Sequence, residues 1–559
     1  MIKTNFLING IFKTSTRKKI KPIFRLKQNR LDIIANDIFT QNPLNILVLF
    51  QEALRTGYLI HPDTMRLVSS KLELVRSLRG NKGAAKVFLD TLLKHGNPER
   101  ALRRMNELGV LGAFIPYFQE IVAMMQFNVY HSYTVDEHTI QVISILSQIE
   151  RGELSESLPI ASNILKGKVN RKVLYVSLLL HDIGKGRDQD HSILGSKIAR
   201  EIAPSLGFSP SDSETIEWLV RNHLLMADMA QKRDIADPRT VRDFAKAVKS
   251  VWRLNLLTVI TVCDIRGVGE NTWNNWKAVL IRALYRQTIR ALEGGMEALN
   301  REQREVDAKK KLRLSLSNWE DTALKVETNR HYSPYWQGLH VTAHTDFALM
   351  LLDIMENEIS VRLTTDEDRD ATRACFVMND HPGIFSRITG ALALVGANVV
   401  DARAYTSKDG FGTNAFWVQD DQGHPYDSKK LPRLKTMIEK TLHGEIIPKK
   451  VLKDKFKKRE RDFDVPTSIT FNNEGSDIYT IIEVDTRDRK GLLYDLSKTL
   501  THANIYIASA VISTYGVQVV DTFYVKDMFG LKLHSKSKKE KIEIKLREAI
   551  LKGFERAIV

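Results

Sequence analysis

Hydrophobic residues recur at helical spacing through the first part of this chain. Between Pro43 and about Asn128, the residues Leu47, Phe50 and Leu54 lie on one side of a predicted helix, and a second such set follows between residues 87 and 93. Short polar breaks at residues 61–63 and 96–98 separate the helices. The pattern predicts an all-helical segment that carries no chemistry of its own.

The chain stays helical from about His131 to Thr328, and histidines gather in this stretch. Residues 173–180 (VLYVSLLL) are apolar on nearly every helical face, which is typical of a buried helix. This run ends directly in His181-Asp182. A carboxylate at the end of a buried helix is costly unless a partner or a metal ion compensates it.

After about Asp370 the pattern changes to alternating strands and helices. A strand at 374–378, a turn at 380–383, a helix at 384–395 and a strand near Asn398 return at 480–484, 488–491, 492–500 and 505 onward. Asp380 and Asp488 are 108 residues apart, and so are Gly383 and Gly491. The sequence therefore predicts two tandem α+β modules.

Composition limits the class of protein without identifying it. The 559 residues are 43% apolar and 27% charged, which excludes wholesale disorder and a collagen-like chain. No run of 18 apolar residues is present, so a membrane-spanning helix is not expected. Two cysteines are too few for a disulfide framework or a Cys-rich zinc site, and we expect a cytoplasmic protein.

The formal net charge of +16 is concentrated in two segments. Residues 1–30 carry nine Lys or Arg and no Asp or Glu, and residues 446–463 carry a net charge of +5. The rest of the chain is close to neutral. A nucleic-acid-binding domain normally carries its positive charge on a folded face, so we expect neither nucleic acid nor a membrane as a partner.

Four residues in the histidine-rich segment are candidate metal ligands: His138, His181, Asp182 and Asp264. Adjacent His and Asp side chains on a helix point about 100° apart, yet both can reach one ion at the helix surface. Imidazole and carboxylate together suit Mn or Fe, or Mg with more water ligands.

Three further residues are candidates for a catalytic role: Lys185, His191 and His223. Lys185 follows His181 by four residues and would share its face if the helix continued that far. Its ammonium group would neutralise a phosphoryl oxygen as negative charge develops. The two histidines are candidates for binding a second ion or a phosphate.

These residues stand in motifs that resemble HD-type metal phosphohydrolases. The motifs are residues 133–138 (YTVDEH), 179–186 (LLHDIGKG), 190–192 (DHS), 222–223 (NH) and 264–266 (DIR). Residues 124–128 (MMQFN) and 273–277 (WNNWK), followed by two repeats of the ACT type, resemble the bifunctional uridylyltransferase/uridylyl-removing enzymes of bacterial nitrogen control. The resemblance runs from about Phe39 to the C-terminus.

The resemblance implies metal-dependent removal of UMP from a uridylylated PII-type signal protein. The family also has an N-terminal transferase domain with a Gly-Ser turn and paired Asp residues. We find no such arrangement before His131 and expect this chain to lack that half. Two alternatives remain, namely an HD-type hydrolase of alarmones or other phosphoesters and a non-catalytic glutamine-sensing partner of a separate transferase.

The ACT-like repeats imply a glutamine site. Each strand ends in an Asp-x-x-Gly turn that opens a helix, and free amides at a helix N-terminus suit a carboxylate. Asp380, Gly383 and Asn398 match the family pattern. In the second repeat Asp488 and Gly491 match, but Lys490 replaces a usual proline and Tyr506 stands where the first repeat has Asn398.

The predicted fold class is a mostly helical HD-type domain followed by two ferredoxin-like α+β ACT modules. The predicted order is a basic tether or linker (1–38), a helical connector (39–128), the HD-type domain (129–330), a linker (331–370), the first ACT-like domain (371–445), a basic linker (446–478) and the second ACT-like domain (479–559).

Overall fold

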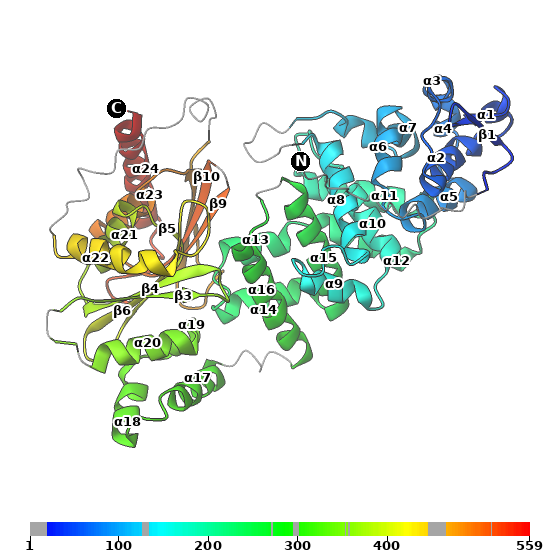
Figure 1. Ribbon diagram of the computed structural model, residues 1–559. Coiled ribbons are helices and arrows are strands. Elements are labelled where there is room, and N and C mark those ends of the chain that lie inside the picture. Colours follow the sequence, from blue (N-terminus) through cyan, green and yellow to red (C-terminus); the bar gives the residue numbers. More distant parts are fainter. Residues whose placement is uncertain are drawn as a thin grey trace, which may run out of the picture. The chain divides into compact units, whose positions relative to one another are not determined.

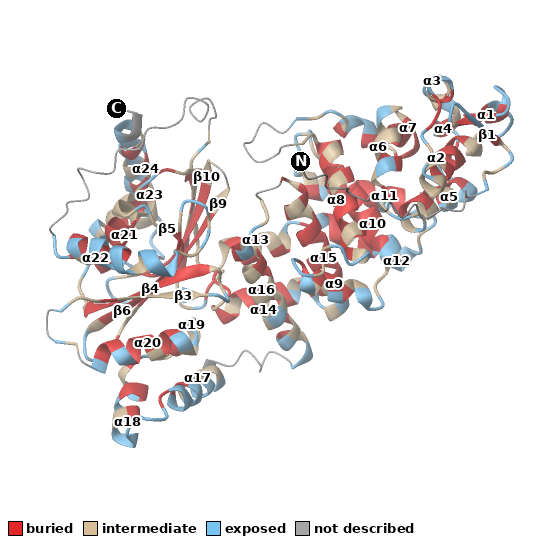
Figure 2. Cartoon of the chain, in the orientation of Figure 1, coloured by how far each residue is buried: buried red, intermediate tan, exposed pale blue. Residues whose placement is uncertain are grey.

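The computed structural model describes most of the chain as two compact units, which we treat separately (Figure 1). The described residues are 19–125, 133–269, 272–294, 301–352, 354–355, 358–444, 465–515 and 517–558. The basic segment 446–463 and residues 1–18 lie outside them. Figure 2 shows buried residues concentrated along α10 and the central strands.

The first unit is helical apart from one hairpin. Its elements are β1 (Phe24–Lys27), β2 (Arg30–Ile33), α1 (Ile38–Gln41), α2 (Leu44–Thr56), α3 (Pro62–Ser69), α4 (Leu72–Arg76), α5 (Lys82–Leu93), α6 (Glu99–Glu107), α7 (Val110–Phe114), η1 (Phe118–Ile121), α8 (Val135–Glu150), α10 (Arg171–Leu180), α11 (His191–Ser205) and α12 (Pro210–Arg221).

The hairpin corrects the expected tether (1–38) only over residues 24–33, because residues 1–18 lie outside the described residues. β1 and β2 pair antiparallel, with Phe24 opposite Ile33. Phe24, Leu31 and Ile33 are buried. The basic residues at 25, 27 and 30 alternate with these apolar ones, so the charge is carried on the exposed side of a folded hairpin.

The second unit begins with helices and ends in one large sheet. Its helices are α9 (Pro159–Lys166, most of which belongs here), α13 (Leu225–Lys232), α14 (Pro238–Val248), α15 (Val251–Gly267), α16 (Asn275–Glu293), α17 (Arg301–Ser315), α18 (Asp321–Arg330), α19 (Ser333–Gly338), α20 (Val341–Leu352), α21 (Ile384–Leu394), η3 (Ser428–Lys430), α22 (Leu431–Leu442), α23 (Leu492–His502) and α24 (Lys536–Ile558).

The sheet has eight strands in the order β3-β4-β6-β5-β9-β10-β8-β7. The strands are β3 (Ser360–Asp366), β4 (Ala371–Asn379), β5 (Asn398–Thr406), β6 (Phe411–Gln419), β7 (Ser468–Asn472), β8 (Thr480–Arg487), β9 (Ile505–Tyr515) and β10 (Gln518–Asp527). The predicted fold class is confirmed, but the residue ranges predicted as linkers, 331–370 and 446–478, include helices or strands of the fold. Residues 331–370 hold α19, α20 and the edge strand β3, and residues 446–478 include the edge strand β7.

The two repeats join along β5 and β9 with a local two-fold relation. Ala402 pairs with Ala510, Asp401 with Val511 and Arg403 with Ser509. Ala402 and Ala510 are separated by the repeat offset of 108, so equivalent positions meet at the centre of this seam. The helices show the same relation, because Thr389 Oγ1 on α21 lies 3.0 Å from Ser497 Oγ on α23.

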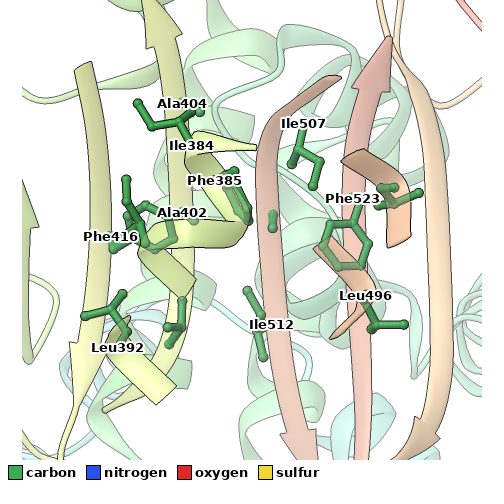
Figure 3. Packing of buried hydrophobic residues seen from close by; sticks show 14 of the residues in the cluster. Ile384, Phe385, Leu392, Ala402, Ala404, Phe416, Leu496, Ile507, Ile512 and Phe523 are labelled. Atoms are coloured by element: carbon green, nitrogen blue, oxygen red, sulfur yellow. The ribbon is translucent and has the colours of Figure 1, made fainter. Parts of the chain in front are cut away.

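One hydrophobic core runs beneath α21 and α23 across both repeats (Figure 3). Phe385 and Leu392 of α21 and Leu496 of α23 face Phe416, Ile512 and Phe523 of the strands, as the figure shows. The other face of the first repeat is covered by α17, α19 and α20, whose buried residues include Trp336 and Phe347. Both faces of the first repeat are therefore covered within this unit.

Candidate functional site

His138 reaches the site from the first turns of α8. Thr134 precedes this helix, and the Asp136 carboxylate accepts hydrogen bonds from the Ala123 backbone (3.2 Å) and from Asn106 Nδ2 (2.7 Å). These bonds fix the start of α8. His138 is 1% exposed. Its imidazole is therefore held in a buried position by the helix that carries it.

His181 and Asp182 follow α10, which ends at Leu180. His181 Nδ1 lies 2.7 Å from the Leu178 carbonyl oxygen, so Nδ1–H donates and the Nε2 lone pair is left to face the site. His138 Nε2 lies 3.2 Å from this Nε2. Asp182 Oδ2 lies 3.3 Å from His181 Nε2 and 3.7 Å from His138 Nε2. Three ligand-type atoms thus converge on one point.

Asp182 is held as a carboxylate. Burial alone would raise its pKa, but His181 and the Lys185 ammonium outweigh that effect, so the pKa lies well below its usual range. Lys185 Nζ lies 2.7 Å from Asp182 Oδ2. α10 ends at Leu180, so Lys185 does not share a helical face with His181. The residues after Leu180 form turns instead, and one of these turns, not a helical face, brings the ammonium to the carboxylate.

His191 joins the same group because the turn after α10 packs closely on the start of α11. A Cβ on Gly184 would collide with the His191 carbonyl oxygen and would lie 2.7 Å from Gly195 N. Asp190 caps α11 by accepting from Ser192 N (2.9 Å) and Ile193 N (3.0 Å). His191 Nε2 lies 3.9 Å from Asp182 Oδ1. Burial lowers the pKa of His191, which favours its neutral form at pH 7.

Five of the seven predicted residues therefore come together in the first unit, and the other two belong to the second. His223 is 1% exposed and stands two residues before α13. Asp264 lies near the end of α15, after a buried apolar run, and is half-buried. An imidazole such as that of His223 and a carboxylate such as that of Asp264 are both common ligands of divalent ions.

A second candidate site is a cavity of about 640 Å³ at the end of the first repeat. Asp380 follows β4, and Gly383 begins α21 with φ +95°, a backbone conformation that favours glycine. Thr406 Oγ1 donates to Asp380 Oδ2 over 2.5 Å. Asn414 lines the cavity, and its buried Nδ2 has no hydrogen-bond partner among the described residues. An amide donor left in this state favours a ligand with an acceptor oxygen.

The cavity is shared between the repeats, which corrects the grouping of Asn398 with Asp380 and Gly383. Asn398 begins β5 and Thr406 ends it, about 26 Å apart at strand spacing. Asn398 is not among the residues that line the cavity, whereas Tyr506 from β9 is. Sequence reasoning identified Tyr506 as a departure from the pattern but missed that it faces the partner repeat's turn. Tyr332 and Tyr335, from the segment expected as a linker, also line the cavity.

The equivalent turn in the second repeat is more acidic. Gly491 begins α23 with φ +79°, and Asp488 follows β8. Asp521 of β10 stands opposite Ile512, as Asn414 stands opposite Ala404 in the first repeat. Burial, followed by the charge of Asp488, raises the pKa of Asp521 well above its usual range. The two turns therefore offer different chemistry to a ligand.

Comparison with known proteins gives family matches over three parts of the chain. Family models match residues 24–114 (uridylyltransferase GlnD third domain), 135–264 (HD domain) and 468–559 (ACR9-like, ACT-like domain). The HD match includes all seven residues discussed above. A bifunctional uridylyltransferase/uridylyl-removing enzyme of Ruegeria pomeroyi is 66% identical over 99% of this chain. This chain is related to the bifunctional uridylyltransferase/uridylyl-removing enzymes.

The chain spans about three-fifths of the length of these relatives. It covers 61% of the Ruegeria pomeroyi protein and 59% of a Cereibacter sphaeroides relative of the same name, which is 63% identical over 98% of this chain. A solved CCA-adding enzyme with ATP aligns with 58% of this chain and 64% of its own, at 14% identity and a TM-score of 0.31, too low to support an argument. No helix in the described part of the chain is long and apolar enough to cross a membrane.

Proposed function

We propose that this chain hydrolyses the phosphodiester between UMP and a PII-type signal protein. The observation that carries the proposal is the convergence of His138 Nε2, His181 Nε2 and Asp182 Oδ2 within 3.7 Å of one another. The uridylyl-removing activity of the named relatives supplies the reaction, and the HD match supplies the class of chemistry.

His138, His181, Asp182 and Asp264 would hold a divalent ion, with Mn or Mg as the first choices. The donor set fits such an ion, because two imidazoles and a buried carboxylate offer lone pairs to one point and His181 is fixed in the required tautomer. When bound, the ion would polarise a phosphoryl oxygen and lower the pKa of a water nucleophile.

Lys185, His191 and His223 would act on the phosphate. The Lys185 ammonium lies beside Asp182 and is placed to stabilise negative charge on a phosphoryl oxygen. His191, neutral at pH 7, can accept a proton at Nε2 or donate a hydrogen bond to the phosphate. His223 contributes a further imidazole, for the phosphate or for a second ion.

Glutamine would regulate the reaction from the cavity of the first repeat. The Asp380 carboxylate suits the ligand ammonium, and the amides that open α21 suit its carboxylate. The unpartnered Asn414 Nδ2 offers a donor to an acceptor oxygen of the ligand. Asp488 and Gly491 are the weaker candidate, because the buried Asp521 adds an acidic group there.

The test is UMP release from uridylylated PII-type protein by the purified chain with Mn, with and without glutamine. We expect release that rises with glutamine and is lost in the His181→Ala/Asp182→Ala variant. The matched variant Asp421→Ala/His424→Ala changes the same residue types on an exposed loop and should behave as wild type. If the wild type binds Mn but releases no UMP, the assignment is wrong and alarmones are the next substrates to assay.

A further inference from the structure

The loop after α13 is bound to the seam between the two repeats by a buried ion pair. Arg403 of β5 donates from Nη1 to Asp234 Oδ2 over 2.7 Å and from Nη2 to Asp234 Oδ1 over 2.8 Å. Ser509 of β9 lies 3.3 Å from the same carboxylate. The Asp234 backbone N–H donates to Tyr524 Oη of β10 over 2.7 Å. One aspartate therefore contacts strands of both repeats.

Neighbouring contacts hold the same segment. Ser513 Oγ of β9 donates to the Gln231 carbonyl oxygen at the end of α13. Arg233 Nη1 lies 2.7 Å from Glu483 Oε2 of β8. With Asp234, these residues fix the C-terminal end of α13 to four strands of the sheet, β5, β8, β9 and β10. The N-terminal end of the same helix begins two residues after His223.

The strands that hold Asp234 also form walls of the effector cavity. Tyr405, which lines the cavity, is two residues from Arg403 and lies on the same face of β5. Ala508, which also lines it, is adjacent to Ser509 on β9. A ligand that changes the fit of β5 against β9 at the cavity would therefore change the distance between the two groups that hold the Asp234 carboxylate.

The geometry points to Asp234 and Arg403 as positioning residues for the hydrolase. We infer that ligand binding in the cavity changes the position of His223, and that the change is transmitted by this ion pair and by α13. The inference rests on the proposed function. It specifies how a glutamine signal would pass within the second unit, and it assigns Asp234 and Arg403 no contact with substrate.

A buried ion pair suits this role because it depends strongly on geometry. Asp234 is 8% exposed and Arg403 is 4% exposed, so their charges are largely removed from water. Arg403 also lies 3.3 Å from Asp401 Oδ2, and Asp401 in turn pairs with Arg369 over 2.9 Å. A shift that separates Asp234 from Arg403 leaves a buried carboxylate without its full compensating charge. Intermediate separations are therefore unfavourable, and the segment after α13 should adopt one of two discrete positions on the strands.

The test replaces the pair by apolar residues of similar size, Asp234→Leu/Arg403→Met, so that neither charge remains buried and unpaired. In wild type we expect glutamine to raise the rate of UMP release by about fivefold or more, the lower end of usual allosteric coupling. In the variant we expect basal release to persist and the glutamine effect to fall below about twofold. Calorimetry should show that glutamine affinity changes by less than about threefold, because no cavity residue is altered.

Hydrogen exchange of the amides in residues 225–235 gives a readout independent of catalysis. We expect glutamine to slow exchange there in wild type and to have no effect there in the variant. Arg403→Lys, which keeps a charge, should restore part of the response. Arg547→Met/Glu543→Leu removes a partly exposed ion pair within α24 and should leave the response intact.

Two results would overturn the inference: a variant that keeps the full glutamine response in both readouts, or a variant that no longer binds glutamine. The second would show that the pair supports the cavity and nothing more. If the wild type releases no UMP, the proposed function fails, and the exchange measurement still decides whether the ion pair couples the cavity to α13.

Discussion

At the scale of single residues, the contacts of each side chain decide its role more than its type does. His181 donates from Nδ1 to the Leu178 carbonyl oxygen of the preceding helix, α10, and this leaves Nε2 as the atom for a ligand. His344 is equally buried, but its Nε2 faces the Tyr335 carbonyl oxygen within a cluster of aromatic rings. The contacts of the first histidine suit the proposed metal ligand, and those of the second suit packing.

Lys185→Met should lower kcat for UMP release by about 100-fold and change KM little. The ammonium is expected to act on charge that develops in the transition state, and the loss of such a group has about this effect. Steady-state kinetics with uridylylated PII-type protein measures both constants. Lys197→Met, on the exposed side of α11, is the control. A rise in KM of about 100-fold with unchanged kcat would assign Lys185 to ground-state binding instead.

His344→Phe should remove part of the acid sensitivity of the fold. Burial lowers the pKa of His344 to about 4 from an ordinary 6.5, so the unfolded chain binds the proton more readily. Stability should therefore fall as the pH drops through this window, by about 2 kcal/mol from this residue between pH 7 and pH 5. Urea unfolding at both pH values, followed by tryptophan fluorescence, measures the difference.

The control for this experiment is His424→Phe, since the His424 side chain is 65% exposed. It should lose as much stability on acidification as wild type does. If His344→Phe also loses as much, a protonated His344 must be accommodated in the fold, and its burial does not govern the acid response.

At the scale of elements, the close approach between the turn after α10 and the start of α11 builds the site. Gly184→Ala should push His191 away from Asp182, destabilise the fold by about 1–3 kcal/mol and reduce UMP release. Gly152→Ala is the comparison, because Gly152 has φ +79° and open space around it. That change should cost about 1 kcal/mol through backbone strain and leave hydrolysis unaffected. Equal activity in both variants would show that His191 is not positioned by this contact.

The sequence alone predicted most of the elements, for physical reasons that vary along the chain. The 108-residue offset predicted the repeats because each module must bury its own strand and helix faces. β3 and β7 were missed because edge strands are short and half exposed, with weak alternation. The β1–β2 hairpin was missed because its basic residues suggested a solvated tether.

Prediction of the sites was limited by partners distant in sequence. His181 and Asp182 could be found because a charge at the end of an apolar helix requires compensation. The position of Tyr506 in the same cavity as Asp380 could not be predicted from the sequence, because it depends on how β5 pairs with β9. Local patterns predict which residues are unusual, but pairing between repeats decides which of them meet.

At the scale of the whole molecule, a bound ligand should stabilise the folded state by an amount that grows with the logarithm of its concentration divided by its Kd. Removal of metal with EDTA should abolish UMP release and lower the unfolding temperature by a few degrees, because an ion at about 100 times its Kd adds about 2.7 kcal/mol. Restored Mn should reverse both changes. His181→Ala should show no shift with EDTA. An unchanged unfolding temperature in wild type would mean that these residues do not hold the ion.

The shared cavity has a consequence for how the protein responds in dilute solution. Its walls come from two modules that one polypeptide keeps together, so their encounter is intramolecular and does not depend on how many copies of the chain are present. A sensor assembled from two separate single-module chains would lose its binding site on dilution. With the modules covalently fused, the concentration of the proposed effector, and not the concentration of the protein, would determine how much of the cavity is occupied.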